Sequence, residues 1–166
     1  LPFSGQQKPD YKYKSLAEVT SSLKKLTAKY ANLCQLSSIG KSYGGLEIYL
    51  LKMAAAQNKV KPEDRQSVLV VANSEGVHLP GTEAALSLAE TILNAYGVDK
   101  YWTDFLNERS IYIIPVVNPD AVSAYFSTPA LERTHNGHPV DEDNDGLIDE
   151  DGPEDLNGDG LITMMR

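Results

Sequence analysis

The chain has 166 residues, of which 42% are hydrophobic and 23% charged, as expected of a globular domain that buries a core. The net charge is −8, but residues 141–159 hold ten Asp and Glu and no Lys or Arg, so the rest is nearly neutral. This distribution argues against a nucleic-acid partner, which needs a basic surface, and no apolar run is long enough for a membrane span. Cys34 is the single cysteine. It excludes an intrachain disulfide and thiolate metal sites, and its apolar surroundings predict a buried, unreactive thiol.

The first predicted helix covers residues 16–32. Ser15 and Glu18 form the ends of a capping-box pattern, Ser-Leu-Ala-Glu. An apolar stripe follows at spacings of three and four, made of Leu16, Val19, Leu23, Leu26 and Tyr30. Two strands are then predicted over 35–39 and 46–53, and the Gly-containing turn between them indicates a hairpin or a neighbouring pair.

A second group of elements predicts a parallel pairing. Residues 67–73 read Ser-Val-Leu-Val-Val-Ala-Asn, a continuous apolar run that predicts a strand buried on both faces. A helix over 82–96, a short helix over 100–107 and an apolar strand over 111–117 follow. Strand, helix and strand in this order predict a βαβ unit, and Pro115 predicts a bulge or an edge near the end of the last strand.

These elements predict an α/β fold with a mixed, partly parallel sheet flanked by helices over residues 1–140, followed by an Asp-rich segment over 141–166. In open α/β sheets, ligands bind beyond the carboxyl ends of strands. Glu75 and His78 follow one such end, and both residue types ligate zinc. Gly76 between them is expected to allow a sharp turn. Taken alone, a Glu and a His three residues apart are a weak signal and favour an ordinary solvent-exposed loop.

Five short pieces of the sequence, taken in order between residues 11 and 120, resemble the zinc metallocarboxypeptidases of the carboxypeptidase A-like family. The pieces are Ser38–Ser42, Gly45–Ile48, Val68–Asn73, Gly81–Leu86 and Ile113–Asp120. The resemblance implies a hydrolase that removes C-terminal residues from peptides with a zinc-activated water. It also implies an incomplete domain, because the family domain is nearly twice as long. The missing C-terminal half, an expected partner, would supply a third zinc ligand and the general base.

The family carries its first two zinc ligands as His-x-x-Glu, and here the order is reversed. The flanking matches place Glu75 at the position of the family's His and His78 at the position of its Glu. The resemblance therefore implies a zinc site with swapped ligands, which is either retained in altered form or lost. Arg133 lies near the family's arginine that polarises the scissile carbonyl, and its alternative is an exposed loop arginine without a catalytic role.

The acidic segment contains two openings of an EF-hand-type calcium loop, in which alternating carboxylates precede a glycine. The candidate calcium ligands are Asp141, Asp143, Asp145, Asp149, Asp155, Asn157 and Asp159. Neither loop has the usual Glu at position twelve, where Gly152 and Arg166 stand. Ten like charges repel one another unless they are neutralised or solvated, so the alternative to calcium sites is a disordered acidic tail. Calcium sites agree with a secreted or periplasmic location.

Three functions follow from these observations. The first is a zinc-dependent carboxypeptidase-like hydrolase acting on peptide C-termini, present here as an inactive fragment that ends inside the second loop pattern and was cut from a longer parent. The second is a catalytically dead carboxypeptidase-like module that binds peptides. The third is a calcium-dependent adhesion or scaffold module that uses residues 141–163.

Overall fold

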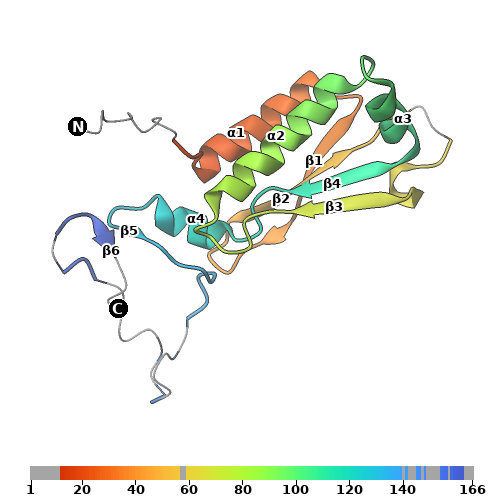
Figure 1. Cartoon of the computed structure of the whole chain (residues 1–166). Helices are drawn as coiled ribbons and strands as arrows, with labels where there is room; N and C mark the ends of the chain where they lie inside the picture. Colours follow the sequence, from red (N-terminus) through yellow and green to blue (C-terminus); the bar gives the residue numbers. More distant parts are fainter. Residues whose placement is uncertain are drawn as a thin grey trace, which may run out of the picture.

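The computed structural model describes residues 12–56, 59–139, 141, 145–146, 148, 154–156 and 158–162. Figure 1 shows the elements along the chain. They are α1 (Leu16–Lys29), β1 (Cys34–Lys41), β2 (Glu47–Met53), a 3-10 turn (Pro62–Asp64), β3 (Ser67–Val71), α2 (Leu79–Ala95), α3 (Lys100–Glu108), β4 (Ser110–Ile114), α4 (Pro119–Tyr125), β5 (Ala130–Leu131) and β6 (Leu161–Ile162). Among the described residues, no helix is both long and apolar enough to cross a bilayer.

The helix α1 begins as the sequence predicts. The hydroxyl of Ser15 accepts a hydrogen bond from the Glu18 amide at 3.4 Å, and the Ser15 amide donates one to the Glu18 carboxylate at 2.8 Å. This reciprocal capping box satisfies two amides that have no partner inside the helix. The apolar stripe buries Val19 and Leu23, and the helix ends at Lys29, three residues before the predicted end.

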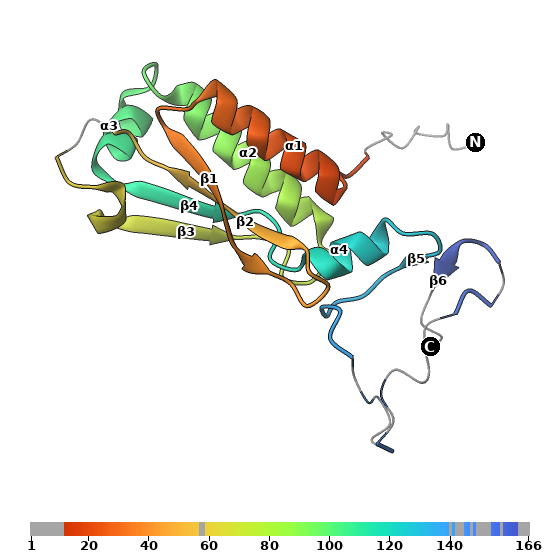
Figure 2. The same ribbon diagram turned by 180° about the vertical axis from the view of Figure 1, so that it is seen from behind.

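The main sheet has four strands in the order β1-β2-β4-β3. The β1–β2 and β2–β4 pairs are antiparallel, and β3 pairs with β4 in parallel through the crossover helix α2. The mixed, partly parallel sheet and the βαβ unit are therefore confirmed. Helices α1 and α2 lie together on one face of the sheet, as the views from both sides show (Figures 1 and 2).

The core lies between this face of the sheet and the two helices. Its most deeply buried apolar side chains are Leu23, Leu51, Met53, Ile92, Leu93, Leu106, Ile113 and Val122. Cys34 is also buried, and burial raises the pKa of its thiol, in agreement with the prediction of an unreactive cysteine.

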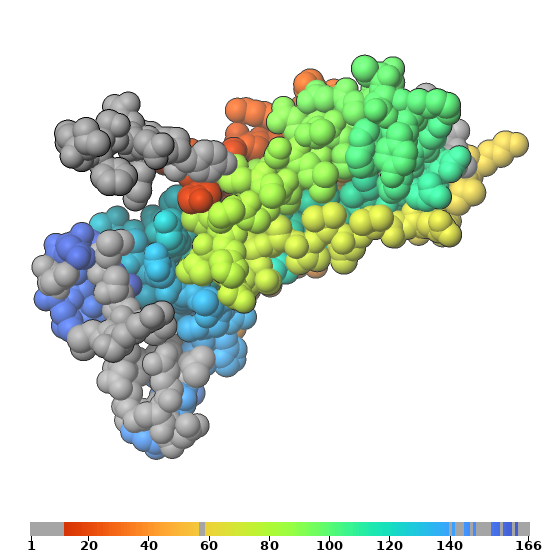
Figure 3. Space-filling view, in the orientation of Figure 1, coloured from red at the N-terminus to blue at the C-terminus, as the bar shows by residue number. Residues whose placement is uncertain are grey.

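The position of β3 differs from the prediction. Among the described residues β3 pairs with β4 only, so it forms an edge of the sheet, and Figure 3 shows this yellow strand along an outer margin of the molecule. Val68, Leu69 and Val71 are 47%, 60% and 49% exposed. The expectation of a strand buried on both faces was wrong. An apolar run in the sequence shows that the side chains are hydrophobic, but it does not show whether other elements of the fold cover them.

The end of β4 also differs from the prediction. The strand lies in the interior of the sheet and ends at Ile114, so Pro115 follows it and does not interrupt the ladder. The short helix α4 was not predicted. Its signal was present, because Asn118 is an N-cap whose side chain accepts from the Ala121 amide at 3.3 Å, and Pro119 occupies the first helical turn.

A second, two-stranded parallel sheet joins β5 to β6. Ala130 pairs with Leu161, and Leu131 pairs with Ile162. The Ala130 amide also donates a hydrogen bond to the Gly160 carbonyl at 2.8 Å. The chain that leaves β5 toward the acidic segment therefore returns to lie beside its own starting point.

Candidate metal site

The site is built where the carboxyl ends of β3 and β4 meet. The hydrogen bonding of the parallel pair continues past the strands: Val117 donates to the Ala72 carbonyl at 3.1 Å, and Asn118 donates to the Asn73 carbonyl at 3.2 Å. The loop after β3 is thereby held against the start of α4. This is the location at which open α/β sheets place their ligands.

Asn73 starts the loop in an unusual conformation. Its φ of 55° lies in the left-handed region, which Asn tolerates better than most residues. The residue is 4% exposed, its side-chain amide donates to the Gly76 carbonyl at 3.4 Å, and its Oδ1 has no hydrogen-bond partner among the described residues. One turn later the His78 amide donates to the Glu75 carbonyl at 2.9 Å, which closes the loop at the start of α2.

This turn brings the two predicted zinc ligands together. His78 Nδ1 lies 3.6 Å from Glu75 Oε2, and the two side chains are 66% and 56% exposed. Two ligands of one tetrahedral zinc ion, each at its usual bond length, lie about 3.3 Å apart. The nitrogen and oxygen donors therefore have the separation and the accessibility that a shared ion requires. Two donors are fewer than a zinc site needs, and the described residues hold no cluster of three His, Cys, Asp or Glu side chains.

Gly76 is required by packing against α4. A Cβ atom on Gly76 would lie 2.0 Å from Ala121 Cβ and 3.0 Å from the Ala121 backbone. The backbone of Gly76 does not adopt a positive φ, so the turn itself does not require a glycine there. A glycine is needed because the loop lies directly against Ala121. The positive φ falls on Asn73 instead.

Two hollows open at this end of the sheet. One, of about 340 Å³, lies between β3 and α2 and includes Asn73 and His78 in its lining. The other, of about 510 Å³, is more polar and is lined by Lys41, Ser74 and His135, among others. Ser74 lines both hollows, so they adjoin at the start of the loop that carries Glu75 and His78.

Asp120 is a buried carboxylate that the sequence analysis did not single out. It is 7% exposed. It accepts hydrogen bonds from the Ser42 hydroxyl and, at 3.1 Å each, from the amides of Gly44 and Gly137. A Cβ on Gly44 would lie 2.7 Å from the carboxylate and one on Gly137 3.3 Å from it, so both glycines permit this contact. One side chain thus joins the β1–β2 turn, α4 and the loop after β5.

The charge of Asp120 is stabilised by these contacts. Burial on its own would raise the pKa of the Asp120 carboxyl. The hydrogen bonds from Ser42, Gly137 and Gly44 lower it by more, and the positive charge of Arg133 adds to them. The pKa of Asp120 therefore lies below its ordinary value, and the ionised form stabilises the fold.

Arg133, the predicted carbonyl-polarising residue, lies two positions after β5 and close enough to Asp120 for their charges to interact. Its Nε is buried and has no hydrogen-bond partner among the described residues. The structure therefore places Arg133 near the Asp120 carboxylate, and the N–H donor at Arg133 Nε is left without an acceptor among the described residues.

Comparison with known proteins identifies the family. A family model for zinc carboxypeptidases matches residues 19–144. The chain belongs to the zinc carboxypeptidase family. Its similarity to individual members agrees: it is 29% identical over 116 residues to a zinc carboxypeptidase from Saccharothrix mutabilis subsp. capreolus, and 30% identical over 120 residues to carboxypeptidase D from Anas platyrhynchos.

Solved structures show the same fold. Thrombin-activatable fibrinolysis inhibitor matches 82% of the chain with a TM-score of 0.69 and 22% identity, and carboxypeptidase A from Helicoverpa armigera matches 75% with a TM-score of 0.64 and 21% identity. This carboxypeptidase-family chain spans only part of these proteins. It covers 26% of the Saccharothrix and 8% of the Anas protein, and 32% and 29% of the two solved chains.

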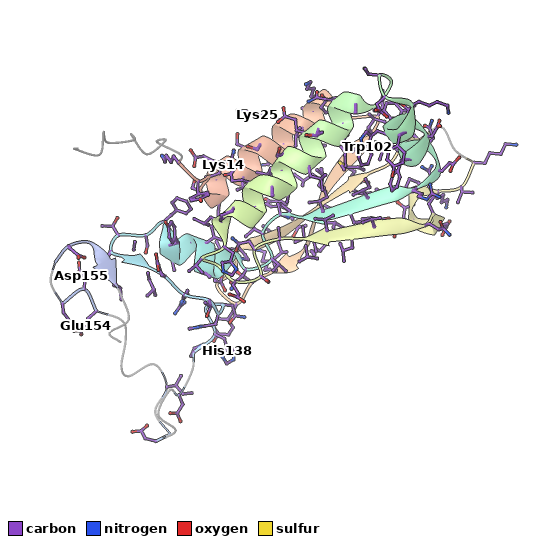
Figure 4. All side chains as sticks on the ribbon, in the orientation of Figure 1. Lys14, Lys25, Trp102, His138, Glu154 and Asp155 are labelled. Atoms are coloured by element: carbon purple, nitrogen blue, oxygen red, sulfur yellow. The ribbon has the colours of Figure 1, made fainter. Side chains whose placement is uncertain are left out.

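The acidic segment of this carboxypeptidase-family chain has two loops with matching hydrogen bonds. Asp141 accepts from the amides of Asp145 and Gly146 at 3.2 and 3.0 Å. Asp155 accepts from Asp159 and Gly160 at 3.2 and 2.8 Å, and both glycines have a positive φ. Figure 4 shows Asp155 and Glu154 on the second of these loops. The other candidate ligands Asp143, Asp149 and Asn157 lie outside the described residues.

The first prediction concerns Gly76. Gly76→Ala places a methyl group against Ala121, so we expect a loss of about 1–3 kcal/mol in the free energy of unfolding, measured by urea denaturation. Gly81→Ala is the matched control, because its Cβ would lie 3.5 Å or more from its neighbours, and we expect a change below about 1 kcal/mol. Equal effects of the two substitutions would contradict the packing role of Gly76.

The second prediction concerns Asp120. Asp120→Asn removes the charge and one acceptor from a site with three donors, so we expect a loss of about 1–3 kcal/mol at neutral pH. Because the folded pKa is lowered, the carboxylate stabilises the fold above the unfolded pKa of about 3.9, and this contribution disappears as the pH falls through the folded value. Denaturation from pH 7 to pH 3 should show the difference between wild type and variant shrinking. Asp104→Asn, which removes an exposed carboxylate that pairs with Lys100 on α3, is the control, and a difference that stays constant with pH would contradict the role of Asp120.

Proposed function

We propose that this chain contributes the N-terminal part of a zinc-dependent carboxypeptidase that removes residues from peptide C-termini. Glu75 and His78 are the two zinc ligands that it supplies, in reversed order. The observation that carries the proposal is the 3.6 Å approach of their donor atoms at the carboxyl end of a parallel strand, in a chain of this family. Zinc accepts carboxylate oxygen and imidazole nitrogen at similar distances, so the reversal is compatible with binding.

Bound zinc would lower the pKa of a water molecule and polarise the scissile carbonyl of the peptide. The residues of this chain would hold the metal ion and orient the peptide. Asn73 and Gly76 fix the turn that aims Glu75 and His78, and the second hollow beside Ser74 accommodates part of the peptide. Arg133, with an unpartnered Nε, is the candidate group for the carbonyl oxygen. The described residues bring no third ligand beside Glu75 and His78, and the sequence shows no general base, so in this proposal the 166-residue chain is inactive by itself.

A module that binds peptides without hydrolysing them would use the same fold and the same hollows. Metal binding separates the two functions, because a hydrolase of this type requires the ion and a binding module does not.

The third prediction therefore concerns zinc. Isothermal titration of the chain with Zn²⁺ should show one site, and Glu75→Ala or His78→Ala should each weaken it by about tenfold or more, since each removes one of two protein ligands. His138→Ala is the matched control, because this imidazole, labelled in Figure 4, is exposed and lies at a tilt beside the Tyr43 ring, away from Glu75 and His78 in the sequence. Zinc affinity that is unchanged in both Glu75 and His78 variants would favour the binding module.

We also propose that the acidic segment binds calcium, with the seven Asp and Asn residues named above as ligands. The support is an arrangement that occurs twice. Asp141 accepts a hydrogen bond from the amide of Gly146, Asp155 accepts one from the amide of Gly160, and both glycines have a positive φ. Compartments rich in calcium are extracellular, so we further propose a secreted or periplasmic protein. In this function the segment serves adhesion or scaffolding and does not depend on the zinc ligands.

The fourth prediction tests the calcium sites. Calorimetric titration with Ca²⁺ should show binding that Asp155→Asn weakens and that Asp104→Asn, on α3, leaves unchanged. Asp155 is a proposed ligand whose carboxylate accepts from three amides of its loop, whereas Asp104 lies on a helix outside the acidic segment. Glu75→Ala should leave calcium binding intact. Calcium binding that is unchanged in Asp155→Asn would contradict the proposal that the acidic segment holds the calcium ion.

A further inference from the structure

Asn118 is a buried residue that joins two segments of the proposed site. It is 8% exposed and precedes α4 as its N-cap. Its backbone amide donates to the Asn73 carbonyl at 3.2 Å, two residues before the first proposed metal ligand. Its side-chain amide donates to the Thr134 carbonyl at 3.1 Å, next to Arg133. A single residue therefore contacts both the loop after β3 and residues 132–137, which we call the Arg133 loop.

The side chain of Asn118 uses both of its polar groups. Its Oδ1 accepts from the Ala121 amide at 3.3 Å and caps α4, while its Nδ2 donates to the Thr134 carbonyl. Among the residues that cap helices well, Asp has no donor, and the hydroxyl of Ser or Thr is shorter than the Asn amide. Asn is therefore the residue type that can cap α4 and hold the Arg133 loop at the same time.

The Arg133 loop depends on the start of α4 for its attachment. After β5 the chain turns back toward the end of the sheet (Figure 1), and residues 134–136 are exposed. In the described part of the chain, the hydrogen bonds from this loop to the main domain go to Asn118 and to Asp120, which accepts from the Gly137 amide at 3.1 Å. The bond to Asn118 is the nearer of the two to the arginine.

The two loops line the same hollow. The polar hollow of about 510 Å³ has Ser74 from the loop after β3 in its lining, together with Thr134 and His135 from the Arg133 loop. Asn118 belongs to the same lining. Because Asn118 bonds to the backbone of both loops, it fixes their separation across this hollow.

We propose that Asn118 is a positioning residue that sets the distance between the Glu75–His78 turn and Arg133. This inference rests on the proposed function, in which a metal ion at the turn and the arginine act on the same peptide carbonyl. Two groups that act on one carbonyl need a fixed separation, because a misplacement of about 1 Å can lower the rate about a hundredfold. Asn118 provides this separation through one backbone bond and one side-chain bond.

The fifth prediction concerns Asn118→Asp in the 166-residue chain. Asp keeps the capping oxygen and the backbone bond to Asn73, but it loses the donor to Thr134. The Arg133 loop therefore opens more often. We expect the Gly137 amide to exchange its hydrogen about tenfold faster, in line with the loss of one hydrogen bond, and the His78 amide to exchange at an unchanged rate.

A second measurement reports the separation of the two loops directly. A nitroxide label on Glu75→Cys occupies an exposed position, and the buried Cys34 does not compete for the reagent. Adding Asn118→Asp should change the paramagnetic relaxation of the Thr134 amide, because the Arg133 loop is released. The relaxation of the α2 amides should stay the same, because α2 follows the labelled loop directly.

Asn136→Asp is the matched control for both measurements. It makes the same replacement in the same loop, and its side chain accepts from the His138 amide, which Asp also can do. Asn118→Ser is measured in parallel, since it keeps a capping oxygen and adds no buried charge that could prevent folding.

Two results would overturn the proposal. One is unchanged Gly137 exchange and Thr134 relaxation in both Asn118 variants. The other is an equal change in the α2 amides, which would make Asn118 a residue that stabilises the whole domain without positioning the loop. None of these measurements requires a metal ion, so a chain that binds no zinc would refute the proposed function and leave this test intact.

Discussion

The parallel pairing of β3 with β4, continued beyond both strands, is the constraint on which the candidate site depends. The amides of Val117 and Asn118 bond to the carbonyls of Ala72 and Asn73, so the loop after β3 cannot move independently of α4. Gly76 then packs directly on Ala121. Because the backbone is held on both sides of the turn, the side chains of Glu75 and His78 approach each other.

Asp120 performs a comparable role for the surrounding loops. Residues 42–44 and 137 are far apart in the sequence, and both approach the same carboxylate closely enough to exclude a side chain at the glycine positions. A buried carboxylate that accepts several hydrogen bonds stabilises the fold only while its donors remain in place, because burying an unpaired charge costs free energy. Asp120 thereby holds Ser42, which lines the hollow beside Lys41 and His135, although Asp120 is not itself part of that lining.

Local signals in the sequence predicted most of the fold. The capping box at Ser15, the apolar stripe of α1 and the strand–helix–strand order were sufficient, because each depends on neighbouring residues only. The assignment of Glu75 and His78 as reversed zinc ligands came from flanking matches and stays a prediction, while the structure places their donor atoms 3.6 Å apart. The exposure of β3 and the role of Asp120 were missed because both depend on segments distant in sequence. The Asn118-Pro119 cap of α4 was a local signal that was overlooked.

The short β5–β6 pair has a consequence for the evolution of the acidic segment. Residues 131 and 161 occupy neighbouring positions in a parallel ladder, so the thirty or so residues between them leave and re-enter the domain at almost one point. The entropy cost of closing such a loop grows only slowly with its length. The Asp-rich pattern can therefore be lengthened or shortened here without disturbing the four-stranded sheet.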